Sequence, residues 1–186
     1  MKTGTKSLLF GVHQFAWHPF TVVLAWKALY GAWPCWKALV CIIVHDWGYW
    51  GKPNMDGNEG GKHPELGAKI VHALFDNPIS GPAYKELVLY HSRHYACKRG
   101  RYPSLLCWAD KYSIQYEPWW LYIPRAWLSG ELDEYRKLCA DAGYIPATSS
   151  HRRWFMWIKD RLVQQSLKRE PAVLCNPVRQ TCDHNG

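Results

Sequence analysis

Histidine and aspartate side chains are the groups in this sequence best suited to chemistry, and two of them, His45 and Asp46, are adjacent. The pair ends the most apolar stretch of the chain, residues 34–44. Burying a carboxylate beside an imidazole at the end of such a stretch is costly unless a partner or a metal ion satisfies both groups. Nitrogen and carboxylate oxygen ligands together suit divalent metal ions, so the pair predicts a metal site.

Other histidines and an aspartate lie at or near the ends of predicted helices. His18 begins one helix, His63 begins another, and His91 and His94 lie toward the end of a third, as read from the sequence. Asp110 falls inside the next predicted helix. Taken singly, each has a structural explanation, since a histidine before proline can be a cap. In a helical bundle, however, some of these helix ends will lie together.

Apolar periodicity, with proline near helix starts and glycine at stops, predicts a chain of helices. We expect helices over residues 18–30, 34–46, 63–75, 81–100, 102–116, 129–143 and 149–170. Residues 40–44 are rich in β-branched side chains, so a short strand is the alternative there. Residues 118–130 are short and interrupted by proline. No repeat and no alternation of strand with helix is present, so the fold class is predicted to be all-α.

The segment between His45 and His63 is rich in turn-forming residues, including five glycines after Asp46 and before residue 62. It lacks the G-x-x-x-x-G-K-[ST] pattern of a nucleotide-binding P-loop. Loops of this kind between packed helices often carry function, and this one could be a mobile lid.

Composition sets the class of protein and of partner. The 186 residues are 48% hydrophobic, enough for one domain, and carry a formal net charge of +8. That charge favours anionic partners such as phosphate esters or nucleic acid. The seven cysteines are scattered without a C-x-x-C pair, which predicts reduced thiols and a cytoplasmic protein. Neither a secretory signal nor a membrane span is expected, so we predict a soluble protein without membrane partners.

The order His18, His45-Asp46, Asp110 resembles the H…HD…D signature of the HD-domain superfamily of metal-dependent phosphohydrolases. "HDWGYWGK" looks like that family's dyad, and "LLCWADKYS" looks like its helix with the last aspartate. His13 is the alternative first ligand. The resemblance implies an HD-domain helical bundle with a C-terminal helical extension. We expect one domain over residues 1–170, with a core at about 18–116, an extension at 117–170 and a flexible tail at 171–186.

The resemblance also implies the ligands and the metal. Its first ion would be held by His18, His45, Asp46 and Asp110. Asp46 would bridge to a second ion held by His63 and His91, and His94 could replace or join His91. A single ion remains the alternative. Mn, Fe, Co, Ni, Zn or Mg would suit, and the lack of an adjacent His-His pair and of a G-Y-P segment argues against cyclic di-GMP hydrolysis.

The implied reaction is attack of a metal-activated water on a phosphate ester of a nucleotide or a related small phosphate compound, with Asp46 and Lys111 as the catalytic residues. Substrate contacts are expected from Lys52, Lys62, Arg93 and His94, and Lys98, Arg99 and Arg101 are further candidate cations. Trp47, Tyr49 and Trp50 could stack on a base. The alternative is a non-catalytic HD-fold protein that binds nucleic acid or another partner, supported by the +8 charge and the basic residues 151–161.

Overall fold

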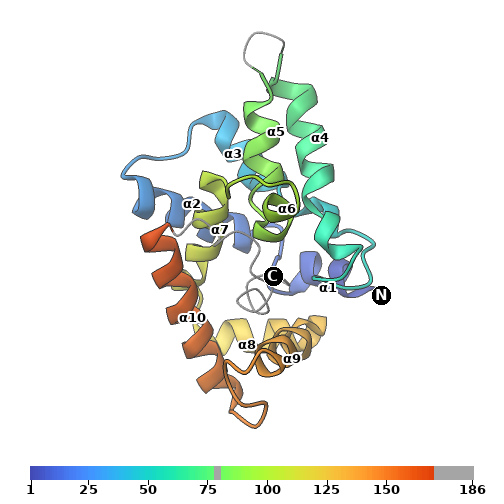
Figure 1. The fold of residues 1–186 in the computed structure, drawn as a ribbon, viewed down its shortest axis with the longest axis vertical. Coiled ribbons are helices and arrows are strands. Elements are labelled where there is room, and N and C mark those ends of the chain that lie inside the picture. The colour runs from blue at the N-terminus through green and yellow to red at the C-terminus, as the bar shows by residue number, and fades with distance from the viewer. Residues whose placement is uncertain (78–80, 170–186) are drawn as a thin grey trace.

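The computed structural model describes residues 1–77 and 81–169, and these residues form helices and no strand (Figure 1). The all-α fold class is therefore confirmed. The helices are α1 Thr3–Phe10, α2 Trp17–Tyr30, α3 Trp36–Val44, α4 Pro64–Phe75, α5 Ala83–Leu89, α6 Arg93–Lys98, α7 Leu105–Tyr112, α8 Trp119–Ser129, α9 Glu131–Asp141 and α10 His151–Lys168. Short 3-10 turns are η1 Trp47–Tyr49, η2 Gly60–Lys62 and η3 Ser113–Tyr116. The predicted tail, residues 171–186, lies outside the described residues.

The first hydrophobic core is formed by α2, α3, α4, α5 and α7. Its buried side chains include Val22, Ile42, Val71, Val88 and Leu106, one from each helix. Helices α4 and α5 run side by side at the top of Figure 1. Residues 40–44 belong to α3, so the helix prediction holds there and the strand alternative is wrong.

The second hydrophobic core joins α8, α9 and α10. Tyr122, Leu132, Trp154 and Phe155 are its largest buried members. Helix α10 packs on α7 as well as on α8, and it runs along one side of the molecule in Figure 1. Because α10 and η3 contact both groups of helices, the two cores are held together along this side.

Three elements differ from the sequence prediction. Residues 81–100 form two helices instead of one, because the chain turns at residues 90–92 and the Ser92 side chain accepts a hydrogen bond from the Tyr95 backbone N–H to begin α6. Helix α1 was not predicted, and it packs against α8 and η1. The proline-interrupted segment is helical throughout α8, with Pro124 inside it.

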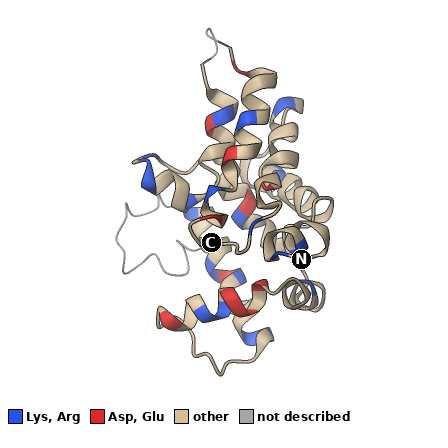
Figure 2. Ribbon diagram, turned by 90° about the vertical axis from the view of Figure 1, so that its right-hand side faces the viewer, with Lys and Arg blue, Asp and Glu red and all other residues tan. Residues whose placement is uncertain are grey.

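Lys and Arg positions, and Asp and Glu positions, are spread over several helices of the described residues (Figure 2). None of the described helices is long and apolar enough to cross a membrane. Cys97 and Cys139 take part in disulfide bonds, so the expectation of reduced thiols is wrong for these two residues.

Candidate metal centre

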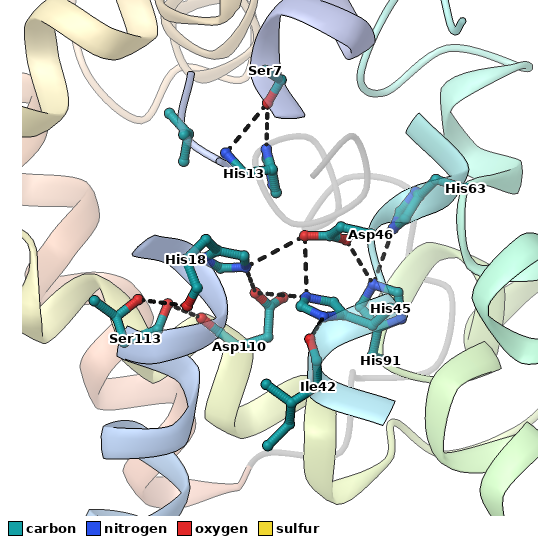
Figure 3. Close-up of polar contacts among 12 residues, drawn as sticks. Ser7, His13, His18, Ile42, His45, Asp46, His63, His91, Asp110 and Ser113 are labelled. Atoms are coloured by element: carbon teal, nitrogen blue, oxygen red, sulfur yellow. Dashed lines mark hydrogen bonds and ion pairs between the residues drawn. The ribbon is translucent and has the colours of Figure 1, made fainter. Parts of the chain in front are cut away.

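Six side chains predicted as metal ligands converge where the first core faces the second (Figure 3). They come from α2, the end of α3, the start of α4, the turn after α5, and α7. All are buried, with at most 9% of each residue exposed. They are His18, His45, Asp46, His63, His91 and Asp110.

The first group of ligand atoms lies around one oxygen of Asp46. Oδ2 of Asp46 is 3.1 Å from Nε2 of His45 and 3.3 Å from Nε2 of His18. Oδ1 of Asp110 completes the group, 3.1 Å from Nε2 of His18 and 3.9 Å from Nε2 of His45. Two imidazole nitrogens and two carboxylate oxygens therefore face one point.

The second group lies around the other oxygen of the same carboxylate. Oδ1 of Asp46 is 3.3 Å from Nε2 of His91 and 3.6 Å from Nε2 of His63. The two imidazole nitrogens are 3.0 Å apart. Asp46 thus presents one oxygen to each group, as a carboxylate bridging two ions would.

Three of the imidazoles are oriented by the same local contact. Nδ1 of His45 lies 2.6 Å from the carbonyl oxygen of Ile42, three residues earlier. His63 and His91 make the equivalent contacts with the carbonyls of Gly60 and Val88, at 2.8 and 2.6 Å. Because a carbonyl only accepts, each Nδ1 must carry the proton. Each neutral ring therefore has its lone pair on Nε2, directed into the centre, an orientation common in histidine metal ligands.

Because these Nδ1 atoms carry the protons, several acceptor atoms at the centre face one another with no hydrogen between them. With both Nδ1 atoms protonated, the Nε2 atoms of His63 and His91 face each other 3.0 Å apart as two acceptors. Nε2 of His45 is also buried, and because its Nδ1 carries the proton it has none to donate to Oδ2 of Asp46, 3.1 Å away. Buried polar atoms are normally satisfied, and a cation would satisfy all of these. Among the described residues, His18-His45-Asp46 and Asp46-His63-His91 are two groups that could hold a metal ion.

The surroundings of His63, His91 and Asp46 favour the protonation states that bind a metal ion. Burial, together with the neighbouring His91, holds the pKa of His63 well below its usual value, and burial also lowers the pKa of His91. Burial opposes ionisation of Asp46, but His45 and other imidazoles hold its pKa well below normal. These residues therefore offer neutral imidazoles and an ionised carboxylate at neutral pH.

His18 and Asp110 form an acid-base pair when no cation is present. Burial would lower the pKa of His18, but Asp110 and Asp46 outweigh it and raise that pKa to about 10. Burial likewise opposes ionisation of Asp110, yet Lys111 and His18 hold its pKa well below the usual range. A metal ion bound here would have to displace the His18 proton, so its affinity should depend on pH.

Glycines allow the segment after Asp46 to pass close to the start of α4. A Cβ on Gly48 would overlap the backbone carbonyl of His63. Next to this contact, the ring of Tyr49 stacks on His63 with centroids 4.0 Å apart. Of the aromatic residues predicted to flank the dyad, Tyr49 is buried, whereas Trp47 and Trp50 are exposed.

A cavity of about 120 Å³ opens from the centre toward the second core. Arg93 and Lys111 line it, and Nζ of Lys111 is 3.1 Å from Oδ2 of Asp110. Lys52, Lys62 and His94 are not among the described residues that line this cavity. Of the predicted cationic contacts, Arg93 and Lys111 are therefore the two that line the cavity, and Nη1 of Arg93 donates a hydrogen bond to Oε1 of Gln165 at 2.9 Å.

His13, the alternative first ligand, faces the cavity but bonds elsewhere. Its Nδ1 is 3.0 Å from Oε1 of Glu131 and 2.9 Å from Oγ of Ser7 (Figure 3 shows the Ser7 contact). Glu131 is fully buried, and its Oε2 also accepts a hydrogen bond from the Val12 backbone N–H. The structure thus places His18, and not His13, beside the two carboxylates.

Several cavity residues were not predicted from the sequence. Asp56 lies in the glycine-rich loop, and its Oδ2 is buried without a partner. Burial and the nearby Glu134 hold the pKa of Asp56 well above its usual value. Glu117 and Trp154 also line the cavity. Only the glycine-rich loop gave any sequence signal for these positions.

Comparisons of the chain with protein-family models, with curated proteins and with solved structures gave no significant match.

Proposed function

We propose that this protein is a metal-dependent phosphohydrolase of the HD type, acting on a small phosphate ester. The observation that carries the proposal is the single carboxylate of Asp46, with imidazole nitrogens 3.1 to 3.6 Å from each of its two oxygens. Two-metal phosphatases use such pairs of sites to bind both the attacking and the leaving oxygen. The resemblance of the residue order to the HD superfamily supports the same reaction class.

Divalent ions at these positions would supply an ionised water near neutral pH and would neutralise charge on the phosphoryl oxygens. The first ion would be held by His18, His45, Asp46 and Asp110. Asp46 would share the second ion with His63 and His91. Mixed nitrogen and oxygen ligation suits Mn, Fe, Co, Ni or Zn better than Ca.

The chain's own cations are placed to bind the phosphate. Burial disfavours the charge on Lys111, but the adjacent Asp110 carboxylate raises the pKa of Lys111 above its usual value. Lys111 is therefore an ammonium at neutral pH, beside the first group of ligands and on the cavity wall. Arg93 is buried on the same wall, and its guanidinium can donate paired hydrogen bonds to phosphate oxygens. Together they orient an anion toward the two ligand groups.

The enclosed position of the centre favours a small substrate over a nucleic-acid surface. The candidate ligands are at most 9% exposed, and they open into a cavity instead of onto an open face. A non-catalytic nucleic-acid-binding role stands as the outcome that would replace this proposal.

The test combines metal loading with a substrate panel. Protein loaded in turn with Mn²⁺, Co²⁺, Ni²⁺, Zn²⁺ and Mg²⁺ is assayed on nitrophenyl phosphate, its bis ester and nucleoside mono-, di- and triphosphates. We expect turnover with at least one ion, and a fall of about 10- to 150-fold in kcat/KM for Lys111→Met, since a hydrogen bond to a charged group contributes about 1.5 to 3 kcal/mol. Lys69→Met, on the exposed face of α4, is the matched control.

Two results would overturn the proposal. The first is a metal-loaded protein that releases no product from any ester while retarding RNA or DNA at moderate salt. The second is a Lys111→Met variant with the kcat/KM of the Lys69→Met control.

A further inference from the structure

The outward side of α3 is apolar along its whole length. Its exposed residues are Trp36, Leu39 and Ile43, which follow one another at spacings of three and four and therefore share one side of the helix. Two more exposed tryptophans follow in and just after η1, so exposed apolar side chains continue past the end of the helix. We call these five residues the tryptophan face: Trp36, Leu39, Ile43, Trp47 and Trp50.

This exposure is unusual because the opposite side of α3 is already packed. Cys41, Ile42 and Val44 are buried in the first core, so the helix is seated on the protein. A surface helix of a globular protein normally presents polar residues on its outward side. A row of large apolar residues on a surface instead marks a site of contact with a protein or a membrane.

The charges in this part of the chain are almost all positive. Residues 1–55 contain five lysines, no arginine and one acidic residue, the buried aspartate shared by the two ligand groups. Lys37 and Lys52 lie at the two ends of the tryptophan face in the sequence. Nζ of Lys37 is 5.7 Å from the centre of the Trp36 ring, which places that ammonium beside the face. The first exposed acidic residue of the chain is Glu59, in the glycine-rich loop.

This combination fits a bilayer better than a protein partner. Protein interfaces are enriched in arginine and depleted in lysine, whereas the cations of residues 1–55 are all lysines. Tryptophan collects at the headgroup level of a membrane, and lysine extends its ammonium to the headgroups while its stem stays in apolar surroundings. Anionic lipids attract such lysines. Tryptophans at both ends of the face, with Leu39 and Ile43 between them, therefore suit the surface of an anionic bilayer.

We propose that the tryptophan face docks this protein on the surface of an anionic bilayer, with α3 lying in the plane of the headgroups. The three indoles enter the headgroup layer, the two aliphatic side chains contact the acyl chains, and Lys37 and Lys52 pair with anionic headgroups. The expectation of no membrane partner rested on the lack of a spanning segment, which a helix bound at the surface does not need. This docking does not depend on the proposed function.

Helix α8 offers a matched control because it also exposes two tryptophans. Trp120 and Trp127 are 62% and 61% exposed, against 65% for Trp36 and 63% for Trp50. The chain that follows α8 is acidic, with Asp133 exposed in the first turn of α9, so we do not expect α8 to bind an anionic surface. The double variant Trp120→Gln/Trp127→Gln therefore removes two indoles of nearly equal exposure from outside the tryptophan face.

Binding is measured by co-sedimentation with vesicles of equimolar phosphatidylcholine and phosphatidylglycerol, and with vesicles of phosphatidylcholine alone. We expect wild type to bind the anionic vesicles at least about 10-fold more tightly than the neutral ones, since each lysine near an anionic surface contributes about fivefold. Trp36→Gln/Trp50→Gln should weaken binding to the anionic vesicles by about 10-fold or more, because less apolar side chain leaves water. Trp120→Gln/Trp127→Gln should bind as wild type does.

A second pair of variants tests the lysines. Lys52→Gln should weaken binding to the anionic vesicles about fivefold. Lys137→Gln, at an exposed position on α9, changes the net charge by the same amount and should bind as wild type does. Because Trp36 also packs on Phe75, with ring centres 5.2 Å apart, Trp50→Gln alone is measured beside the double variant, and Tm is recorded for each protein.

Three results would overturn the proposal. The first is a wild-type protein that does not sediment with anionic vesicles. The second is an equal loss of binding in the α3 and α8 double variants, or binding that no tryptophan variant weakens, which would be adsorption by charge alone. The third is a dimer in sedimentation velocity that Trp50→Gln dissociates, without vesicle binding, which would assign the tryptophan face to a second copy of the chain.

Discussion

Asp46→Asn tests the metal centre most directly because one carboxylate serves both ligand groups. Asparagine keeps the shape of the side chain and replaces one oxygen by an amide NH₂. In the metal-free protein that NH₂ can donate to one of the Nε2 lone pairs, and a buried negative charge is removed. The lowered pKa of Asp46 means that its ionised form stabilises the folded protein, so we expect a Tm below that of metal-free wild type, and each protein is compared with its own metal-free Tm.

The response to metal should differ strongly between the two proteins. An ion at 100 times its Kd stabilises the folded state by about 2.7 kcal/mol. A chain of this size gains about 2 to 4 °C in Tm per kcal/mol, so wild type should rise by about 5 to 11 °C. If Asp46→Asn weakens affinity about 100-fold, the same ion concentration equals Kd and gives only about 0.4 kcal/mol. The expected rise is then about 1 to 2 °C.

Differential scanning calorimetry with Mn²⁺ or with EDTA measures both shifts, and elemental analysis of the desalted protein measures the bound metal. Asp133→Asn, at an exposed position on α9, is the control and should respond as wild type does. An Asp46→Asn protein with the wild-type Tm rise and metal content would refute the assignment of Asp46 as the shared ligand.

Two further substitutions probe the supports of the centre. Glu131→Gln should lower the free energy of unfolding by about 3 kcal/mol at pH 7, because hydrogen bonds to a buried charge are lost. Burial opposes ionisation of Glu131, but His13 holds the pKa of Glu131 below its usual value of 4.5. The ionised Glu131 therefore stabilises the folded protein fully above pH 4.5, and this stabilisation is lost as the pH falls through the lowered pKa. In urea unfolding, the difference in free energy of unfolding between wild type and Glu131→Gln should become smaller below pH 4.5. A difference that stays constant with pH would contradict this prediction. Gly48→Ala should displace His63, because the added Cβ would overlap the His63 carbonyl, and should lower Tm. Elemental analysis should then find one bound metal ion instead of two, with Gly61→Ala as the control. An unchanged metal content would show that the close contact between Gly48 and His63 is not needed for binding the second ion.

The parts of the centre that follow from local sequence were predictable. The apolar residues of α3 specify a buried helix, and the adjacent His45 and Asp46 at its end are costly there without a ligand. Asp110 on α7 was assigned as a ligand from the resemblance of the residue order to the H…HD…D signature, since no local pattern marks it. Convergence of helix ends in a bundle then brought these segments to one point.

Long-range pairing was not predictable in the same way. Glu131 bonds to His13 across 118 positions in the chain, and no periodic pattern records which buried carboxylate will meet which imidazole. The cavity wall on the second core depends on α10 packing beside α8, and helical periodicity gives the buried face of α10 without saying which helix covers it. The division of residues 81–100 into two helices likewise depends on the Ser92 cap.

Local and long-range contributions fix different properties of the centre. The direction of each Nε2 lone pair is set within one turn, since His45, His63 and His91 each bond the carbonyl three residues earlier. The distances between those nitrogens are set by the packing of α3, α4 and α5 around the first core. Loosening that core should therefore leave each imidazole correctly directed and change only the separation of the ligands. Affinity for the second ion, whose two imidazoles are 3.0 Å apart on different helices, should be the first property to fall.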